Sequence, residues 1–134
     1  MTNAITSSDL QQYRKIKREV RHLQELIAAE SRIFFPRIPT LTGMPHGSGA
    51  TDRLGEEVAR YLDRLKQLSD KVADLQLTLT IIEDAVESLA DADERDILRM
   101  RYMTGETWKE IAYKSALSVS TCKRIHNRAL EHLR

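Results

Sequence analysis

The sequence predicts an all-α protein: a long helical hairpin or coiled coil, followed by a C-terminal helix-turn-helix of three short helices. Along two long segments, apolar residues recur at steps of three and four, which is the spacing of one helix face. Prolines and glycines gather between these segments, and two helix-start signals follow each other closely near the end. We therefore expect four parts: residues 1–35, 36–52, 53–90 and 91–134.

The first part, residues 1–35, is predicted to be an amphipathic helix that runs from Ser8 to about Phe35. Pro36 and Pro39 end it, because proline lacks the backbone donor that a helix needs. Its apolar face comprises Tyr13, Ile16, Val20, Leu23, Ile27 and Phe34. Its basic residues are Arg14, Lys15, Lys17, Arg18 and Arg21. This basic run fits three interpretations: contact with DNA, pairing with an acidic helix or, most simply, a solvated helix face.

Residues 36–52 read as a loop or linker, since they contain all three prolines and three of the five glycines. The glycine pattern follows no predicted strand and lacks the lysine of a phosphate-binding loop. We therefore expect a connection between two helices rather than a nucleotide site.

Residues 53–90 are predicted to form one long helix, because neither glycine nor proline occurs between Glu56 and Leu89. The apolar residues are spaced alternately four and three positions apart throughout, which is the spacing of a coiled-coil seam. The seam residues, expected to serve helix packing or oligomerisation, are Leu54, Val58, Tyr61, Leu65, Leu68, Val72, Leu75, Leu79, Ile82, Val86 and Leu89. This seam fits a parallel homodimer and an intrachain antiparallel hairpin equally well. Beside it, Leu62, Leu77 and Ile81 widen the apolar face.

Residues 107–133 read as a helix-turn-helix, a unit that inserts its second helix into the major groove of DNA. Thr107 and Glu110 make a capping box, residues 115–117 make the turn, and Ser118 caps the second helix. The inward positions of that helix are Cys122, Ile125, Ala129 and Leu133. A plain helical hairpin is the alternative. The small Ala112, placed where the helices cross, and a polar, basic outer face favour DNA binding.

The pattern EIA-x5-S-x2-T-x-KR-x3-RAL-x2-L, from Glu110 to Leu133, resembles region 4 of σ70-type sigma factors, which reads the upstream promoter hexamer. The preceding ERDILRMRYMTGETW resembles the leading helix of that domain. The resemblance implies that Val119, Ser120, Lys123 and Arg124 face base edges. It also implies phosphate contacts by Thr121, Asn127 and Arg128. Val119 and Ser120 are smaller and less polar than many sigma counterparts, so the same promoter element is not implied.

A second resemblance concerns the linker. GMPHGSGATDRLG, from Gly43 to Gly55, is similar to a linker of small phage and prophage proteins, among them late-transcription activators of the RinA and ArpU type. Many of these carry a sigma region 4-like C-terminus. The resemblance implies a regulator of late or packaging genes, encoded by a phage or prophage.

The charge distribution supports a DNA-binding C-terminus. The net charge is only +1, yet residues 53–94 carry −6 and residues 95–134 carry +5. The basic end is therefore the part suited to neutralising phosphates. One cysteine excludes an intramolecular disulfide framework, and no segment has the apolar length of a membrane span. We expect a protein of the bacterial cytoplasm.

Catalysis is not expected. The four histidines form no i, i+4 ligand pair, and one cysteine cannot complete a zinc site, so no metal or cofactor is predicted. The predicted function is sequence-specific binding of double-stranded DNA in transcription control, by a homodimer or higher oligomer, with host RNA polymerase as a candidate partner. Two rivals remain: a small terminase subunit that recognises DNA for packaging, and a polymerase-binding adaptor without DNA affinity.

Overall fold

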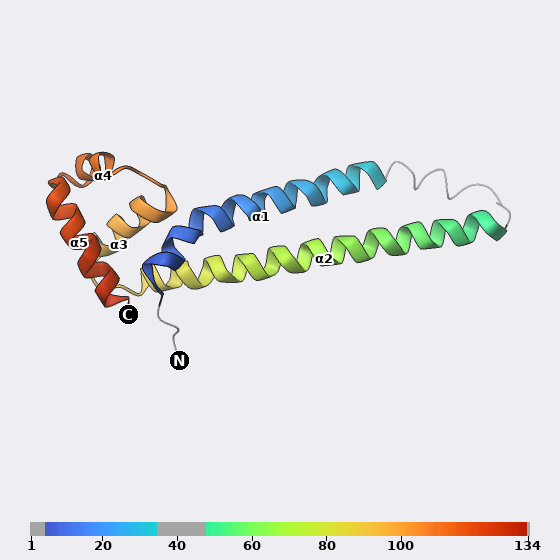
Figure 1. Ribbon diagram of the computed structural model, residues 1–134, viewed down its shortest axis with the longest axis horizontal. Coiled ribbons are helices and arrows are strands. Elements are labelled where there is room, and N and C mark those ends of the chain that lie inside the picture. Colours follow the sequence, from blue (N-terminus) through green and yellow to red (C-terminus); the bar gives the residue numbers. More distant parts are fainter. Residues whose placement is uncertain (1–4, 35–47, 134) are drawn as a thin grey trace. The chain divides into compact units, whose positions relative to one another are not determined.

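The computed structural model describes residues 5–34 and 48–133 (Figure 1), with side chains from residue 53 onward in the second range. In order, the elements are α1 (Ser7–Phe34), α2 (Ser48–Glu87), α3 (Ala92–Leu98), the π-helix η3 (Arg99–Met103), α4 (Trp108–Ser115) and α5 (Val119–His132). Every regular element in the described ranges is helical, which confirms the all-α prediction. None of these helices is both long enough and apolar enough to span a membrane.

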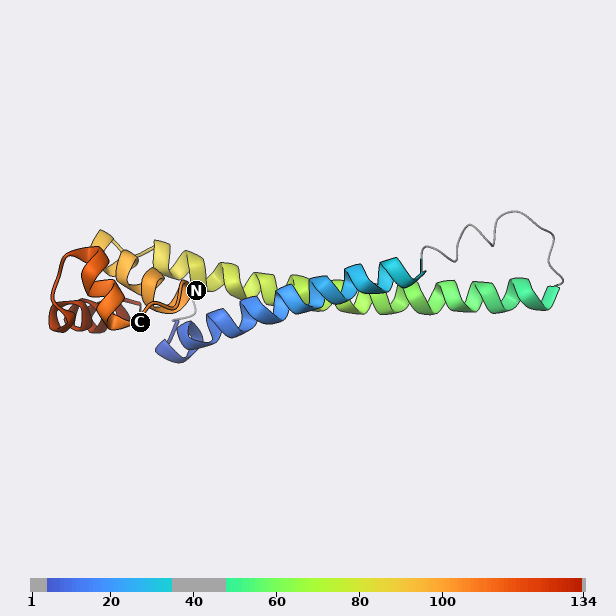
Figure 2. The ribbon, with the colours of Figure 1, turned by 90° about the horizontal axis from the view of Figure 1, so that it is seen from above.

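The chain divides into two compact units, one of residues Glu19–Leu75 and one that combines residues 1–18 with residues 76–134. The first unit is an antiparallel pair of helices formed by α1 and α2 (Figure 2). Glu19 pairs with Lys71 at 3.5 Å, and Glu30 pairs with Arg64 at 3.0 Å. Partner numbers fall along α2 as they rise along α1, so the two helices run in opposite directions.

The predicted seam of α2 packs against α1 in this pair. Tyr61 stacks on Phe34 with ring centroids 4.1 Å apart, and Val72 is buried. The structure thus contains the intrachain hairpin, in which the seam of α2 faces α1. Leu62, beside the seam, is 55% exposed.

Helix α2 begins at Ser48, inside the segment 36–52 that was expected to be a linker. The physical reason is that Pro45 is the last proline of this segment. Gly49, beyond it, lowers helix propensity without preventing a helix. Residues 35–47, which carry most of the predicted linker and the first part of its resemblance to phage proteins, lie outside the described residues.

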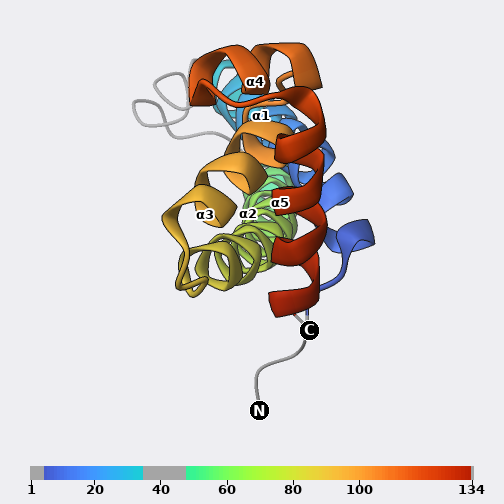
Figure 3. The same ribbon diagram turned by 90° about the vertical axis from the view of Figure 1, so that its left-hand side faces the viewer.

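In the second unit, α3 and α4 both pack against α5 (Figure 3). The buried core of this three-helix domain consists of Ile97, Ile111, Cys122 and Ile125. The same unit includes the first turns of α1 and the last turns of α2. Buried Tyr13 of α1 donates its hydroxyl to Glu83 of α2, and its burial together with that carboxylate raises the pKa of Tyr13 to about 12.

The leading helix of the domain ends in a π-turn at Gly105. Thr104 N donates to Arg99 O at 3.0 Å, and Glu106 N donates to Met100 O at 2.8 Å. Gly105 between them has φ +71°, a left-handed conformation that glycine adopts without strain. This wide turn fixes the short loop that leads from η3 to the cap of α4.

Candidate nucleic-acid interface

The caps predicted for the helix-turn-helix are present. Thr107 Oγ1 accepts from Glu110 N at 3.2 Å, and Glu110 Oε2 accepts from Thr107 N at 3.3 Å, which completes the capping box. Ala116 closes α4 with φ 58°, in a left-handed conformation that is more common for glycine. Ser118 Oγ accepts from Thr121 N at 3.2 Å and starts α5. The geometry of the turn therefore agrees with the sequence prediction.

The inner face of α5 is fixed by apolar packing. Cys122 and Ala129 are fully buried, and Ile125 is 8% exposed. These positions are the inward ones that the helical spacing predicted. Because they recur on one side of the helix, the opposite side must face away from the domain core.

That outer face carries the candidate base-contacting residues. Its exposed residues are Val119, Ser120, Lys123, Arg124, Asn127 and Arg128. Among the described residues, no carboxylate pairs with Lys123 or Arg124. Thr121 is half-buried, and its hydroxyl accepts from Ser118 Oγ at 2.8 Å, so it takes part in the cap of α5.

A stack of aromatic rings supports the side of this face. His126 contacts the Trp108 ring edge-on at 5.1 Å and stacks with Tyr102 at 5.6 Å, measured between ring centroids. Lys123 Nζ lies 6.0 Å from the centroid of the same Trp108 ring. The sequence had indicated only that the histidines form no metal site. It contains no signal for the stacking of His126 with Trp108 and Tyr102.

Each ring nitrogen of His126 has one hydrogen-bond partner, and together these partners fit a neutral imidazole. Nδ1 lies 3.1 Å from Asn127 Oδ1, which only accepts, and Nε2 lies 2.6 Å from Tyr102 Oη. The network therefore assigns the proton to Nδ1 and makes Tyr102 the donor to Nε2. Burial lowers the pKa of His126; the bond to Asn127 opposes this shift, and the charge of Arg101 adds to it.

Arg128 is placed differently from the other cations of α5. Its Nε donates to Glu94 Oε1 at 2.7 Å, and its Nη2 donates to Asp91 Oδ2 at 2.8 Å. Glu94 is only 1% exposed, and His132 Nδ1 lies 2.9 Å from the same carboxylate. Burial raises the pKa of Glu94, but hydrogen bonds from His132 and Arg128 outweigh it, and the net shift is downward. The geometry favours a structural role for Arg128 over the predicted phosphate contact.

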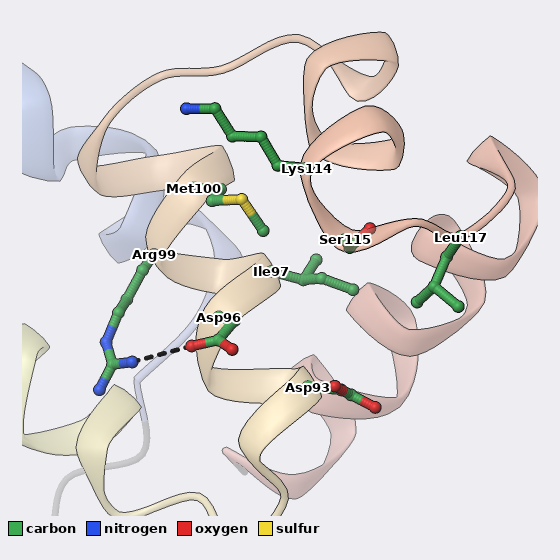
Figure 4. A pocket seen from close by; sticks show the side chains of 8 residues that line it. All are labelled: Asp93, Asp96, Ile97, Arg99, Met100, Lys114, Ser115 and Leu117. Carbon is green, nitrogen blue, oxygen red and sulfur yellow. Dashed lines mark hydrogen bonds and ion pairs between the residues drawn. The ribbon is translucent and has the colours of Figure 1, made fainter.

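A groove of about 400 Å³ lies between α3, η3 and the end of α4 (Figure 4). Charges of both signs line it, and they are neutralised locally: Arg99 pairs with Asp96 at 3.0 Å, and Lys114 pairs with Glu106. A polyanion finds no net attraction in such a groove. The outer face of α5 is the better candidate for contact with DNA.

The fold and the capped turn between α4 and α5 define a helix-turn-helix domain. Residues 87–134 match the family model described as Sigma-70, region 4. This part of the chain is therefore similar to sigma-70 region 4, as the resemblance of residues 94–133 implied. Domains of this family bind DNA and interact with RNA polymerase. No curated protein and no solved structure shows a significant match to the chain.

Proposed function

We propose that the protein is a sequence-specific transcription regulator that reads promoter DNA with the first turns of α5. The observation that carries this proposal is the pair Lys123 and Arg124. Both are exposed on the outer face of a capped, well-packed recognition helix, and neither has a carboxylate partner among the described residues. Cations in this position are free to donate to acceptors on base edges.

Each outward residue has a contact suited to its chemistry. Lys123 and Arg124 are donors of the kind that bind guanine O6 and N7, and Val119 offers an apolar contact for the methyl group of thymine. Ser120 is small enough for its hydroxyl to approach either kind of base. Phosphates are assigned to the free amide N–H groups of Asn127 and to the N-terminal turn of α5 around Thr121.

The test begins with selection of bound sequences from a randomised duplex library by the full chain. Lys123→Ala combined with Arg124→Ala is then expected to reduce discrimination between the selected duplex and a scrambled one by about 1–3 kcal/mol for each base pair that these side chains read. The matched control, Arg53→Ala with Lys66→Ala, removes the same charge from exposed positions of α2. This control should keep the discrimination of the wild type. Full discrimination by the Lys123/Arg124 variant would refute the assignment of readers.

The two rival functions predict other outcomes. A small terminase subunit would form ring assemblies in sedimentation and bind a packaging ATPase. A polymerase adaptor without DNA affinity would show no binding to any duplex even at low salt, where phosphate contacts are strongest. The regulator should bind its selected duplex and occupy promoters when bound sites are mapped across the bacterial genome.

We further propose that the regulator is encoded by a phage or prophage and belongs to the group of RinA and ArpU, which would place it in the bacterial cytoplasm. The support is the sequence of residues 43–55, and mapped sites upstream of late or packaging genes would test it.

We also propose that two copies associate through α2. Leu77 and Ile81, one helical turn apart, are 61% and 47% exposed, and a second copy of the same apolar stripe would cover them symmetrically. Sedimentation equilibrium of the wild type and of Leu77→Lys with Ile81→Lys tests this; a monomeric wild type would exclude it.

A further inference from the structure

A second basic surface lies in the same compact unit as the helix-turn-helix. It is a cleft of about 340 Å³ between the first turns of α1 and the end of η3, and its polar lining consists of Gln11, Arg14, Lys15, Arg18, Arg101 and Tyr102. Its charged lining is positive throughout. In this respect it differs from the groove in Figure 4, which has both acidic and basic side chains in its lining.

The cations of the cleft lack protein counter-ions. Arg14, Lys15 and Arg18 are exposed, and no carboxylate among the described residues pairs with any of them. Arg101 donates only to a backbone carbonyl, that of Glu106 at 3.4 Å. Cations gathered in this way repel one another, and an anionic ligand removes that repulsion.

The cleft has a defined wall. The guanidinium of Arg14 lies over Gly105, in the space that a Cβ at this position would occupy. Gly105 also has φ +71°, so its backbone conformation favours glycine, and a side chain here would have to displace the Arg14 guanidinium. The π-turn that ends η3 therefore forms one wall of the cleft, next to the Arg14 guanidinium.

The cleft is connected to the outer face of α5 through the aromatic stack. The Arg101 guanidinium lies 4.7 Å from the centroid of the Trp108 ring, over which Lys123 also lies. Tyr102, which lines the cleft, bonds to His126, and His126 bonds to Asn127. Positive charge thus continues from the base-contacting face to α1 without an intervening ion pair.

We propose that this cleft binds the sugar-phosphate backbone of the DNA duplex that α5 reads, so that Arg14, Lys15, Arg18 and Arg101 make a second set of phosphate contacts outside the major groove. The proposal rests on the proposed function and adds α1 to the DNA interface. These contacts are independent of base sequence, since phosphate oxygens are the same at every step.

The test measures the affinity of the full chain for a mixed-sequence duplex of about 30 base pairs by fluorescence anisotropy over a range of salt concentrations. Lys15→Ala combined with Arg18→Ala is expected to lower the slope of log affinity against log salt by about 1–2, because each phosphate contact contributes about 0.9. The control, Lys17→Ala with Arg21→Ala, removes the same charge from exposed positions of the same helix that do not line the cleft. Its slope should stay close to that of the wild type.

Two further measurements separate the outcomes. Lys15→Arg with Arg18→Lys keeps both charges and should keep the slope, and circular dichroism shows that each variant is folded. An unchanged slope in the Lys15/Arg18 alanine variant would overturn the proposal and would direct attention to an acidic protein surface as the partner. That outcome would leave the proposed function intact, provided that Lys123→Ala with Arg124→Ala still reduces discrimination between the selected and the scrambled duplex. Absence of all duplex binding by the wild type would instead refute the proposed function itself.

Discussion

Both halves of α5 carry basic side chains, but the structure places them differently. In the first half, Lys123 and Arg124 are exposed and have no carboxylate partner among the described residues. In the second half, Arg128 is bound to Asp91 and Glu94, and His132 contacts Glu94 as well. Exposure of a cation on a recognition helix is therefore not the same as its availability to DNA.

This difference has a physical basis in Glu94. Its carboxylate is buried in the first turn of α3, and a buried anion is tolerated only when it is paired and hydrogen-bonded. The second half of α5 supplies those donors and so fastens the helix to α3. The first half is held by its cap and by apolar packing, which leaves its cations free. One half anchors the helix, and the other half is free for recognition.

The largest expected effect is the loss of this anchor. Glu94→Ala removes two charge-assisted hydrogen bonds and is expected to lower the free energy of unfolding by about 2 kcal/mol, after allowance for the solvent exposure of both donors. Denaturation by urea, followed by circular dichroism, measures the change. Glu131→Ala is the control, since Glu131 is exposed on α5 and pairs with no cation among the described residues. Equal stability of the two variants would mean that Glu94 does not anchor α5.

A smaller and more specific effect separates Arg124 from Arg128. Arg124→Ala should lower the salt slope of DNA binding by about 1 and leave the melting temperature unchanged. Arg128→Ala should do the reverse, because it removes a partner of buried Glu94. Anisotropy titrations and thermal melts of both variants give the comparison. If Arg128→Ala lowered the slope without loss of stability, Arg128 would be a phosphate contact, as the sequence resemblance implied.

Local signals made most of the domain predictable from sequence. The capping box at Thr107, the cap at Ser118 and the inward spacing of Cys122, Ile125 and Ala129 depend on neighbours within one or two helical turns, and the structure confirms each of them. Such local rules identify which side of α5 faces out.

The parts that sequence could not predict depend on residues far apart in the chain. The bond from Arg128 to Glu94 spans 34 positions, and the cleft joins α1 to η3 across about 90 residues. The outward position of Arg128 follows from helical spacing, but its partner does not. The same applies to α2, whose seam suited a hairpin and a dimer equally until the pairs with α1 were known.

The smallest expected effect is on the pH dependence of stability, to which His126 and Glu94 contribute in different pH ranges. His126, beside the base-contacting face, has its pKa lowered chiefly by burial, so its neutral form is favoured in the folded state. A lowered pKa adds stability that is fully present above the pKa of the unfolded chain, about 6.5, and is lost as the pH falls through the folded value. Glu94 also has a lowered pKa, and its contribution is lost only below about pH 4.5, the ordinary value of its carboxyl. Melting temperatures between pH 7.5 and 5.5 should therefore fall more for the wild type than for His126→Gln, while Glu94→Gln should follow the wild type. A decline that disappeared in Glu94→Gln would place the titrating group at Glu94 or its partners rather than at His126.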